Sequence, residues 1–282
     1  MSSAVTSDGG VGNLAPPEIW RLCLTWLERS AEVISGSAPA LNAINVFPVA
    51  DSDTGTNLQQ TLTGIMAHLD GTSGAEDWTA DLVPVDGRSS GAEPSPADLV
   101  VRAAVLSAHG NSGAIVAEMI ISLSRALERS GLIVPTRPER GLAQVLRTVA
   151  VAGRRAVARP VAGTILTVAD AAARAAEDAV VDGVADHRAE HPDVGVSRVL
   201  AVAEVARAAA AEALRHTPQE LARLADAGVV DAGGQAYVLL LDVLVEVLGG
   251  PPAEPLRAVP TPVLDHRPVP SAAPLEYEVM YA

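Results

Sequence analysis

Residues 42–57 read Asn-Ala-Ile-Asn-Val-Phe-Pro-Val-Ala-Asp-Ser-Asp-Thr-Gly-Thr-Asn, and this stretch decides how the rest of the chain is organised. It places two carboxylates, Asp51 and Asp53, in a segment where Pro48 removes a backbone donor and Gly55 indicates a turn. Apolar residues then recur at helical spacing: Leu58, Leu62, Ile65, Met66 and Leu69. The pattern predicts a loop that presents two carboxylates at the N-terminus of a helix.

Two interpretations of this loop are open from the residues alone. Thr54, Thr56 and Asn57 stand where a helix has free N–H groups and needs caps, and the two carboxylates can complement the helix dipole. A hard cation held by the oxygens of Asp51 and Asp53, with phosphate oxygens completing its shell, fits the same arrangement. Helix capping and a cation–phosphate site are both consistent with the spacing.

Composition narrows the function classes. The 282-residue chain has a net charge of −14, so nucleic acid and anionic membrane surfaces are not expected partners. All 20 basic residues are Arg, which excludes a phosphate-binding lysine of the Walker type and a Schiff-base lysine. Aromatic residues make up only 2% of the chain, so we expect an Ala-rich core of closely approaching helices.

The chain has one cysteine, Cys23, on an apolar helix face, where it is expected to be a small buried hydrophobe. A single cysteine leaves no disulfide framework and no cysteine zinc site. No charged-then-apolar signal segment opens the chain, and no apolar run approaches the ~20 residues of a membrane span. We therefore expect a cytoplasmic protein and not an integral membrane protein.

The organisation of the chain can be predicted in outline. Residues 16–250 are expected to form one helical domain, preceded by a disordered N-terminus over 1–15. A flexible insert is predicted at 70–96, and a Pro-rich linker with the start of a further domain at 251–282. Periodicity predicts eight substantial helices, a short turn of helix at 218–227, and no strand before the C-terminal tail. Four of the expected helices are 16–35, 96–107, 140–159 and 197–216.

Three further turns precede expected helices: Ala108-His-Gly-Asn-Ser-Gly113, Gly163-Thr164 and Asp231-Ala-Gly-Gly-Gln235. From the spacing alone, the first turn is interpreted as a tight helix hairpin and the second as a helix N-cap. The third is interpreted as a helix cap whose glycines permit close packing. One end of a helical bundle can collect all of these helix starts.

Ser112 is rejected as a hydrolase nucleophile because its flanks are helical and the glycine spacing is wrong. His187 and His191 have metal-like spacing, but Pro192 follows at once, so a solvated helix end is preferred.

The stretch at 42–57 closely resembles the signature Asn-Val-Phe-Pro-Val-Pro-Asp-Gly-Asp-Thr-Gly-Thr-Asn of bacterial fatty acid kinases. Their N-terminal domain is related to the nucleotide-binding L-subunit of dihydroxyacetone kinases (DhaL-like). The three further turns match the same family in the same order, and the resemblance covers about residues 15–250. The chain departs from the family pattern at Ala50, Ser52, His109, Ala162 and Ala236.

This resemblance implies an all-α fold, an eight-helix antiparallel barrel with Mg-ATP at one mouth. It implies that Asp51 and Asp53 are the catalytic residues and hold Mg²⁺, with Asn45 as a candidate third metal ligand. The nucleotide- and phosphate-binding residues that it implies are Thr54, Thr56, Asn57, Asn111, Ser112, Gly113, Gly163, Thr164, Asp231, Gly233 and Gly234.

The resemblance also implies a kinase and its acceptor. That acceptor is a fatty acid carboxylate presented by a separate, DegV-like fatty-acid-binding protein, or dihydroxyacetone on a partner subunit, and the fatty-acid signature is the better match. A homodimer is a further assembly to consider. The five departures keep a second hypothesis open, a nucleotide-sensing or scaffold domain that no longer transfers phosphate. The intact pair Asp51 and Asp53 argues against this second hypothesis.

Overall fold

The computed structural model describes residues 16–72, 94–128, 137–183 and 194–257, and this part of the chain is all-helical with no strand. Its helices are α1 (Pro16–Ala43), α2 (Thr54–Thr72), α3 (Pro96–Ser107), α4 (Gly110–Glu128), α5 (Pro138–Arg155), α6 (Ile165–Val181), α7 (Val194–Glu220), α8 (Ala222–Ala227) and α9 (Ala232–Val247). The expected all-α class is confirmed. The predictions for 1–15, for most of 70–96, for His187 and His191, and for 258–282 lie outside the described residues.

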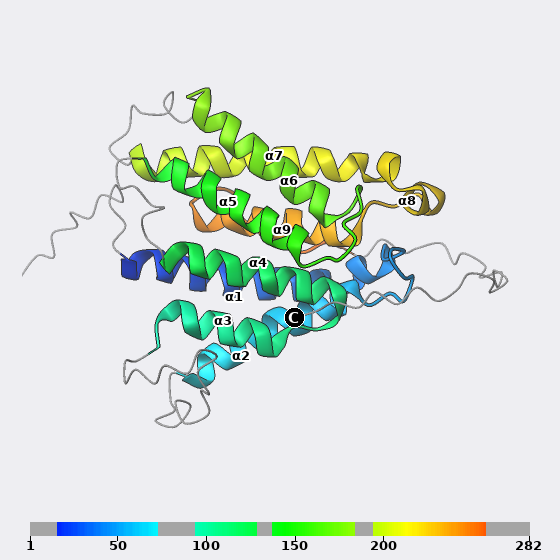
Figure 1. Cartoon of the computed structure of the whole chain (residues 1–282), viewed down its shortest axis with the longest axis horizontal. Helices are drawn as coiled ribbons and strands as arrows, with labels where there is room; N and C mark the ends of the chain where they lie inside the picture. Colours follow the sequence, from blue (N-terminus) through cyan, green and yellow to red (C-terminus); the bar gives the residue numbers. More distant parts are fainter. Residues whose placement is uncertain (1–15, 73–93, 129–136, 184–193, 258–282) are drawn as a thin grey trace, which may run out of the picture.

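Contacts between the long helices form a closed ring, which Figure 1 shows from the side. Each one packs against the next along the chain from α1 to α7, α7 packs against α9, and α9 packs against α1. Because consecutive helices run up and down, α2, α4, α6 and α9 begin at one end of the ring, where α1, α3, α5 and α7 end. We call this the site end, and the short helix α8 lies there between α7 and α9. The eight-helix antiparallel barrel is thus the observed arrangement.

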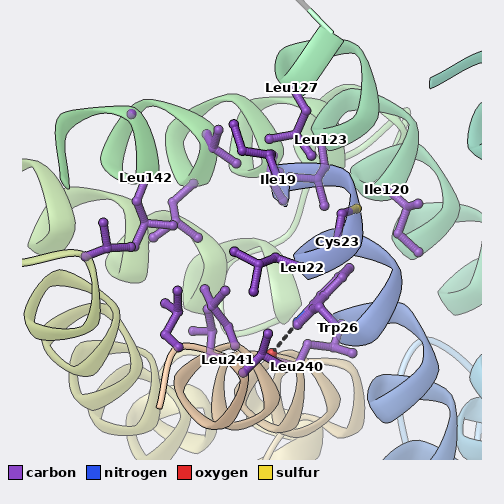
Figure 2. Close-up of a pocket in the computed structure, with 18 of the residues that line it drawn as sticks. Ile19, Leu22, Cys23, Trp26, Ile120, Leu123, Leu127, Leu142, Leu240 and Leu241 are labelled. Atoms are coloured by element: carbon purple, nitrogen blue, oxygen red, sulfur yellow. Dashed lines mark hydrogen bonds between the residues drawn. The ribbon is translucent and has the colours of Figure 1, made fainter. Parts of the chain in front are cut away.

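The first and last helices close the ring through specific contacts. Trp26 of α1 donates from its indole Nε1 to the carbonyl oxygen of Leu240 in α9 over 3.0 Å, as the dashed line in Figure 2 shows. Arg29 donates to both carboxylate oxygens of Glu246, at 2.8 and 3.2 Å. These contacts join parts of the chain that are more than two hundred residues apart in sequence.

Small side chains allow the helices to approach closely, as the composition predicts. Helices α6 and α7 face each other with alanines that have no exposed surface: Ala169, Ala172, Ala173, Ala176, Ala203, Ala206 and Ala210. Because an alanine core has little side-chain volume, the backbones come together and many small contacts replace a few large ones.

An apolar cavity of about 200 Å³ lies inside the ring, toward the end opposite the site end. Its position follows from Ile19 near the start of α1, Leu127 near the end of α4 and Pro138 at the start of α5, which all line it. Figure 2 shows further lining side chains, among them Leu22, Cys23, Leu123, Leu142 and Leu241. Cys23 is buried here as expected, and burial raises the pKa of its thiol to about 12.

Helix α1 runs further than the sequence predicts. The expected end is near Ser35, but the helix continues through Pro39 for two more turns. Leu41 has no exposed surface, and a Cβ on Gly55 of α2 would lie 2.2 Å from the carbonyl oxygen of Ala38. This close packing against α2 stabilises the last turns of α1 and offsets the backbone hydrogen bond that Pro39 cannot make.

Helix α7 also passes its predicted end at His216 and continues through Pro218. Thr217 has no exposed surface; its hydroxyl donates to the carbonyl oxygen of Leu214 and accepts from the backbone N–H of Asp231, at 2.7 and 3.1 Å. Contacts made across the fold therefore decide where this helix ends, and the local proline signal does not.

Helix α5 is shorter at its C-terminus than the predicted range 140–159. It ends at Arg155, and residues 156–164 connect it to α6 without helical structure. The proline at 160 disfavours a helical conformation for the residue before it, which fits an early end. No helix among the described residues is long and apolar enough to cross a membrane.

Candidate functional site

Four helix starts converge on a cavity of about 70 Å³ at the site end. Thr54 comes from α2, Ser112 from α4, Thr164 from the N-cap of α6, and Asp231 and Gly233 from the start of α9. Backbone N–H groups in the first turn of a helix have no partner within the helix and attract anions. The four starts together give this cavity a field that favours negative charge.

The loop between α1 and α2, residues 44–53, presents the two carboxylates beside this cavity. We call it the acidic loop. The buried amide of Asn45 donates from Nδ2 to Asp51 Oδ1 over 2.7 Å and to Asp53 Oδ1 over 3.5 Å. Burial raises the pKa of Asp53, the neighbouring Asp51 raises it further, and a hydrogen bond from Asn57 opposes the shift. A positive group beside the pair would stabilise both charges.

The donor set of the acidic loop fits a hard divalent cation. Oδ1 of Asn45 is buried and has no hydrogen-bond partner among the described residues, although buried polar atoms nearly always have one. Carboxylate and amide oxygens are the ligands that Mg²⁺ takes in proteins. No group of three or more His, Cys, Asp or Glu that could hold a metal occurs in the described part of the chain. A cation here would therefore share its shell with water or ligand oxygens.

The acidic loop is held by contacts between its two flanking segments and by one contact at its middle. The amide of Asn42 donates from Nδ2 to Thr56 Oγ1 over 2.9 Å, and its Oδ1 accepts from the backbone N–H of Thr56 over 3.1 Å. Arg223 of α8 donates to the carbonyl oxygen of Pro48 over 2.8 Å. Ser52 has a φ of +56°, the left-handed region that favours glycine, and it stands where the resembling signature has Gly. The chain keeps the turn at a cost in backbone strain.

The turn between α3 and α4 packs tightly against the start of α2. Gly110 has a φ of +59°, and a Cβ there would lie 2.2 Å from Nδ2 of Asn57. A Cβ on Gly113 would lie 2.2 Å from Oγ1 of Thr61. Thr54 and Ser112 link the two helix starts through their hydroxyls over 3.3 Å. Only glycine at 110 and 113 allows this approach, which brings the acidic loop and the turn together.

His109, which replaces the arginine of the resembling family, does not line the cavity. Its backbone N–H donates to Oγ1 of Thr61 over 3.1 Å, and its Nδ1 lies 2.7 Å from the carbonyl oxygen of Ser107. The imidazole is therefore held against its own turn.

The starts of α6 and α9 are capped by their own side chains. Thr164 accepts from the N–H of Leu166 at 3.4 Å, and Asp231 accepts from the N–H of Gly234 at 2.7 Å. Burial raises the pKa of Asp231 to about 6, while hydrogen bonds from the backbone of Gly234 and Ile165 oppose the shift. Asp231 thus lines the cavity and caps a helix at once.

The structure brings only part of the expected set to the cavity wall. The expected residues that line it are Thr54, Asn111, Ser112, Thr164, Asp231 and Gly233. The expected residues outside its lining are Asn45, Asp51, Asp53, Thr56, Asn57, Gly113, Gly163 and Gly234. Gly163 and Gly234 pack against neighbouring helices: a Cβ on Gly234 would lie 2.9 Å from Val168 Cγ2, and one on Gly163 3.0 Å from the carbonyl oxygen of Thr217.

Other lining residues were not expected: Phe47, Pro48, Ile115, Val157, Arg159, Val161, Ile165 and Leu166. Phe47 and Pro48 belong to the decisive stretch, so their place in the sequence was a usable signal. Arg159 was hidden by the prediction of a helix through that position.

Comparison with known proteins places most of the chain in one domain family. Residues 48–246 match the model of the DAK2 domain. An uncharacterized protein of Staphylococcus haemolyticus is 30% identical over 222 residues, which cover 79% of this chain and 34% of that protein. Uncharacterized proteins of Staphylococcus epidermidis and Staphylococcus aureus are 30% and 28% identical over 226 residues, 80% of this chain and 35% of theirs. The chain spans about a third of the length of the curated relatives it matches.

Proposed function

The chain belongs to the DAK2 domain family, and from this premise we propose that it is a Mg-ATP-binding phosphotransferase domain. The more specific proposal is the kinase domain of a fatty acid kinase that acts in the cytoplasm. Its acceptor would be a fatty acid carboxylate presented by a DegV-like fatty-acid-binding protein. A homodimer is compatible with the same chemistry.

One observation carries the proposal: four helix starts and two carboxylates occupy the same end of the ring. Helix starts favour an anion, whereas two neighbouring carboxylates favour a cation. A metal-bound polyphosphate contains both charges, so a single ligand satisfies the whole site. A plain anion would be repelled by the acidic loop, and a lone cation would gain nothing from the helix starts.

Each group of residues has a part in this proposal. Asp51, Asp53 and Asn45 would hold Mg²⁺, which supplies neutralisation of the phosphate charge when bound. Hydroxyls and amides at the helix starts would orient the phosphates, and the segment from Asp231 to Gly234 would lie toward the nucleotide. The residues that would orient metal or phosphate are Thr54, Thr56, Asn57, Asn111, Ser112, Gly113, Gly163 and Thr164. Phosphoryl transfer depends mainly on such positioning and charge neutralisation.

The acceptor chemistry favours a carboxylate. A fatty acid is already ionised at neutral pH and can attack phosphorus without losing a proton. The hydroxyl of dihydroxyacetone needs a general base. Asp231, the one carboxylate in the described cavity lining, already accepts from the backbone N–H of Gly234 as the cap of α9, so it is not free to take the proton of an acceptor hydroxyl. A dihydroxyacetone-type kinase subunit is therefore the second candidate.

Calorimetry of ATP binding with and without Mg²⁺ tests the proposal, with Asp53→Ala alongside. We expect binding that requires Mg²⁺ and is lost in this variant. Asp70→Ala is the matched control, because Asp70 is an exposed carboxylate near the other end of α2. A folded wild-type protein that fails to bind Mg-ATP would exclude the kinase. Binding without transfer to a fatty acid on a DegV-like carrier would favour the nucleotide-sensing alternative.

A further inference from the structure

Arg159 lies between α5 and α6, directly before Pro160, and lines the cavity at the site end. The residue is exposed, and its guanidinium has no hydrogen bond or ion pair within the described chain. Among the described residues that line the cavity it is the one basic side chain, and Asp231 is the one acidic side chain. Because Asp231 is directed to the backbone of Gly234, the charge of Arg159 is not neutralised there.

Arg154 and Arg155, in the last turn of α5, do not line the cavity, and two other basic groups near the site end are engaged elsewhere. Arg223 donates to the carbonyl oxygen of Pro48 over 2.8 Å, and the imidazole of His109 is held against Ser107. The chain contains no lysine and has a net charge of −14. A polyanion that approaches the acidic loop therefore meets one cation supplied by the described cavity wall, and that cation is Arg159.

We propose that Arg159 binds a phosphate of the nucleotide, an inference that rests on the proposed function. A guanidinium presents two parallel N–H donors that match two oxygens of one phosphate. Its neighbours in the lining, Asn111 and Ser112, can donate to the same anion through amide and hydroxyl groups. Arg159 thus supplies from the α5–α6 segment the positive charge that the α3–α4 turn lacks, since His109 is turned away.

The test compares Mg-ATP dissociation constants of four variants by calorimetry: Arg159→Gln, Arg159→Glu, Arg155→Gln and Arg155→Glu. Arg155 is the matched control, because it is an exposed arginine in the last turn of α5 that does not line the cavity. We expect Arg159→Gln to raise the dissociation constant about tenfold, the effect of one lost charge-assisted hydrogen bond. Arg159→Glu should raise it further, while both Arg155 variants stay within about twofold.

Two further measurements separate loss of a phosphate contact from loss of stability. Thermal unfolding without ligand should be unchanged in Arg159→Gln, because this exposed side chain has no partner to lose among the described residues. The salt dependence of Mg-ATP binding should become shallower in the same variant. If Arg159→Gln binds like the wild type while Asp53→Ala does not bind, Arg159 is not a phosphate ligand and the proposed function stands. An equal loss of Mg-ATP affinity in Arg155→Glu and Arg159→Glu would mean that only the net charge of the protein matters. That result would also overturn the inference. No binding by the wild type would overturn both.

Discussion

The amide of Asn45 bridges the acidic loop: its Nδ2 donates to Asp51 over 2.7 Å and to Asp53 over 3.5 Å. One buried group thus holds two like charges close together. Its own Oδ1 has no partner in the described structure, although it is buried beside them. The two carboxylates are therefore held in place before any ligand binds. The repulsion between their charges favours binding of a cation.

Removal of this bridge should weaken metal-dependent binding. In Asn45→Ala the carboxylates lose their common donor and the loop loses a buried anchor, so we expect the dissociation constant for Mg-ATP to rise about tenfold. Calorimetry at several Mg²⁺ concentrations measures the change. Gln60→Ala, which removes an exposed amide from α2, should leave binding unaltered. Wild-type affinity in Asn45→Ala would mean that the carboxylates keep their geometry without the amide.

Asp231 should make stability depend on pH. Burial raises its pKa from 3.8 to about 6, so the folded state disfavours the charged form. Protonated Asp231 therefore contributes to the free energy of unfolding. This contribution is complete below the pKa of the side chain in the unfolded chain, 3.8, and is lost as the pH rises through about 6. At higher pH the buried charge costs about 3 kcal/mol.

Asp231→Asn keeps an oxygen for the N–H of Gly234 but removes the charge. We expect it to raise the free energy of unfolding by about 2–3 kcal/mol above pH 6 and to have little effect below the ordinary aspartate pKa. Asp231→Ala, which also loses the cap, should gain about 1 kcal/mol less. Urea unfolding across this pH range is the measurement. A gain for Asp231→Asn that is independent of pH would contradict the assignment.

Gly110→Ala should disturb both stability and the site. The residue has a φ of +59°, and its added Cβ would lie 2.2 Å from Nδ2 of Asn57, which hydrogen-bonds Asp53. We expect a loss of about 1–3 kcal/mol in unfolding free energy together with weaker Mg-ATP binding. Gly228→Ala is the matched control, because Gly228 has a φ of +64° but no atom within 4 Å of its added Cβ. It should lose about 1 kcal/mol and keep its affinity.

The apolar cavity predicts opposite effects for the same substitution at two valines. Val145 lines the cavity, so Val145→Leu should gain about 0.8 kcal/mol by burying one more methylene. Val116 is buried in the packed core away from the cavity, and Val116→Leu should lose about 1–3 kcal/mol by overpacking. Denaturant midpoints of the two variants test this. A loss for Val145→Leu as large as that for Val116→Leu would show that the cavity does not accept a larger side chain.

The helix starts that build the site were predictable because their signals are local. Asp51 and Asp53 precede a clear 3.6-residue pattern, and Thr164 and Asp231 are N-cap residue types directly before their helices. No local pattern predicts that the helices close into a ring. That prediction came from the resemblance, and the packing of α9 on α1 supports it.

The misjudged features depend on contacts between distant segments. The predicted ends of α1 and α7 are near residues 35 and 216, yet both helices continue because Leu41 and Thr217 are buried against other elements. Arg159 reaches the cavity because α5 ends early, which the sequence pattern did not indicate. Helix propensity is a weak prior that such packing overrides.

The closure of the ring by α1 and α9 has a consequence for biosynthesis. The partners of Trp26 and Arg29 are Leu240 and Glu246, which are synthesised more than two hundred residues later. Neither contact can form until almost the whole described domain has left the ribosome. Until then the apolar face of α1 lacks its final neighbour while the intervening helices pair locally. A nascent chain stalled before residue 232 would therefore hold an open, sticky arc of helices, the kind of intermediate that chaperones bind.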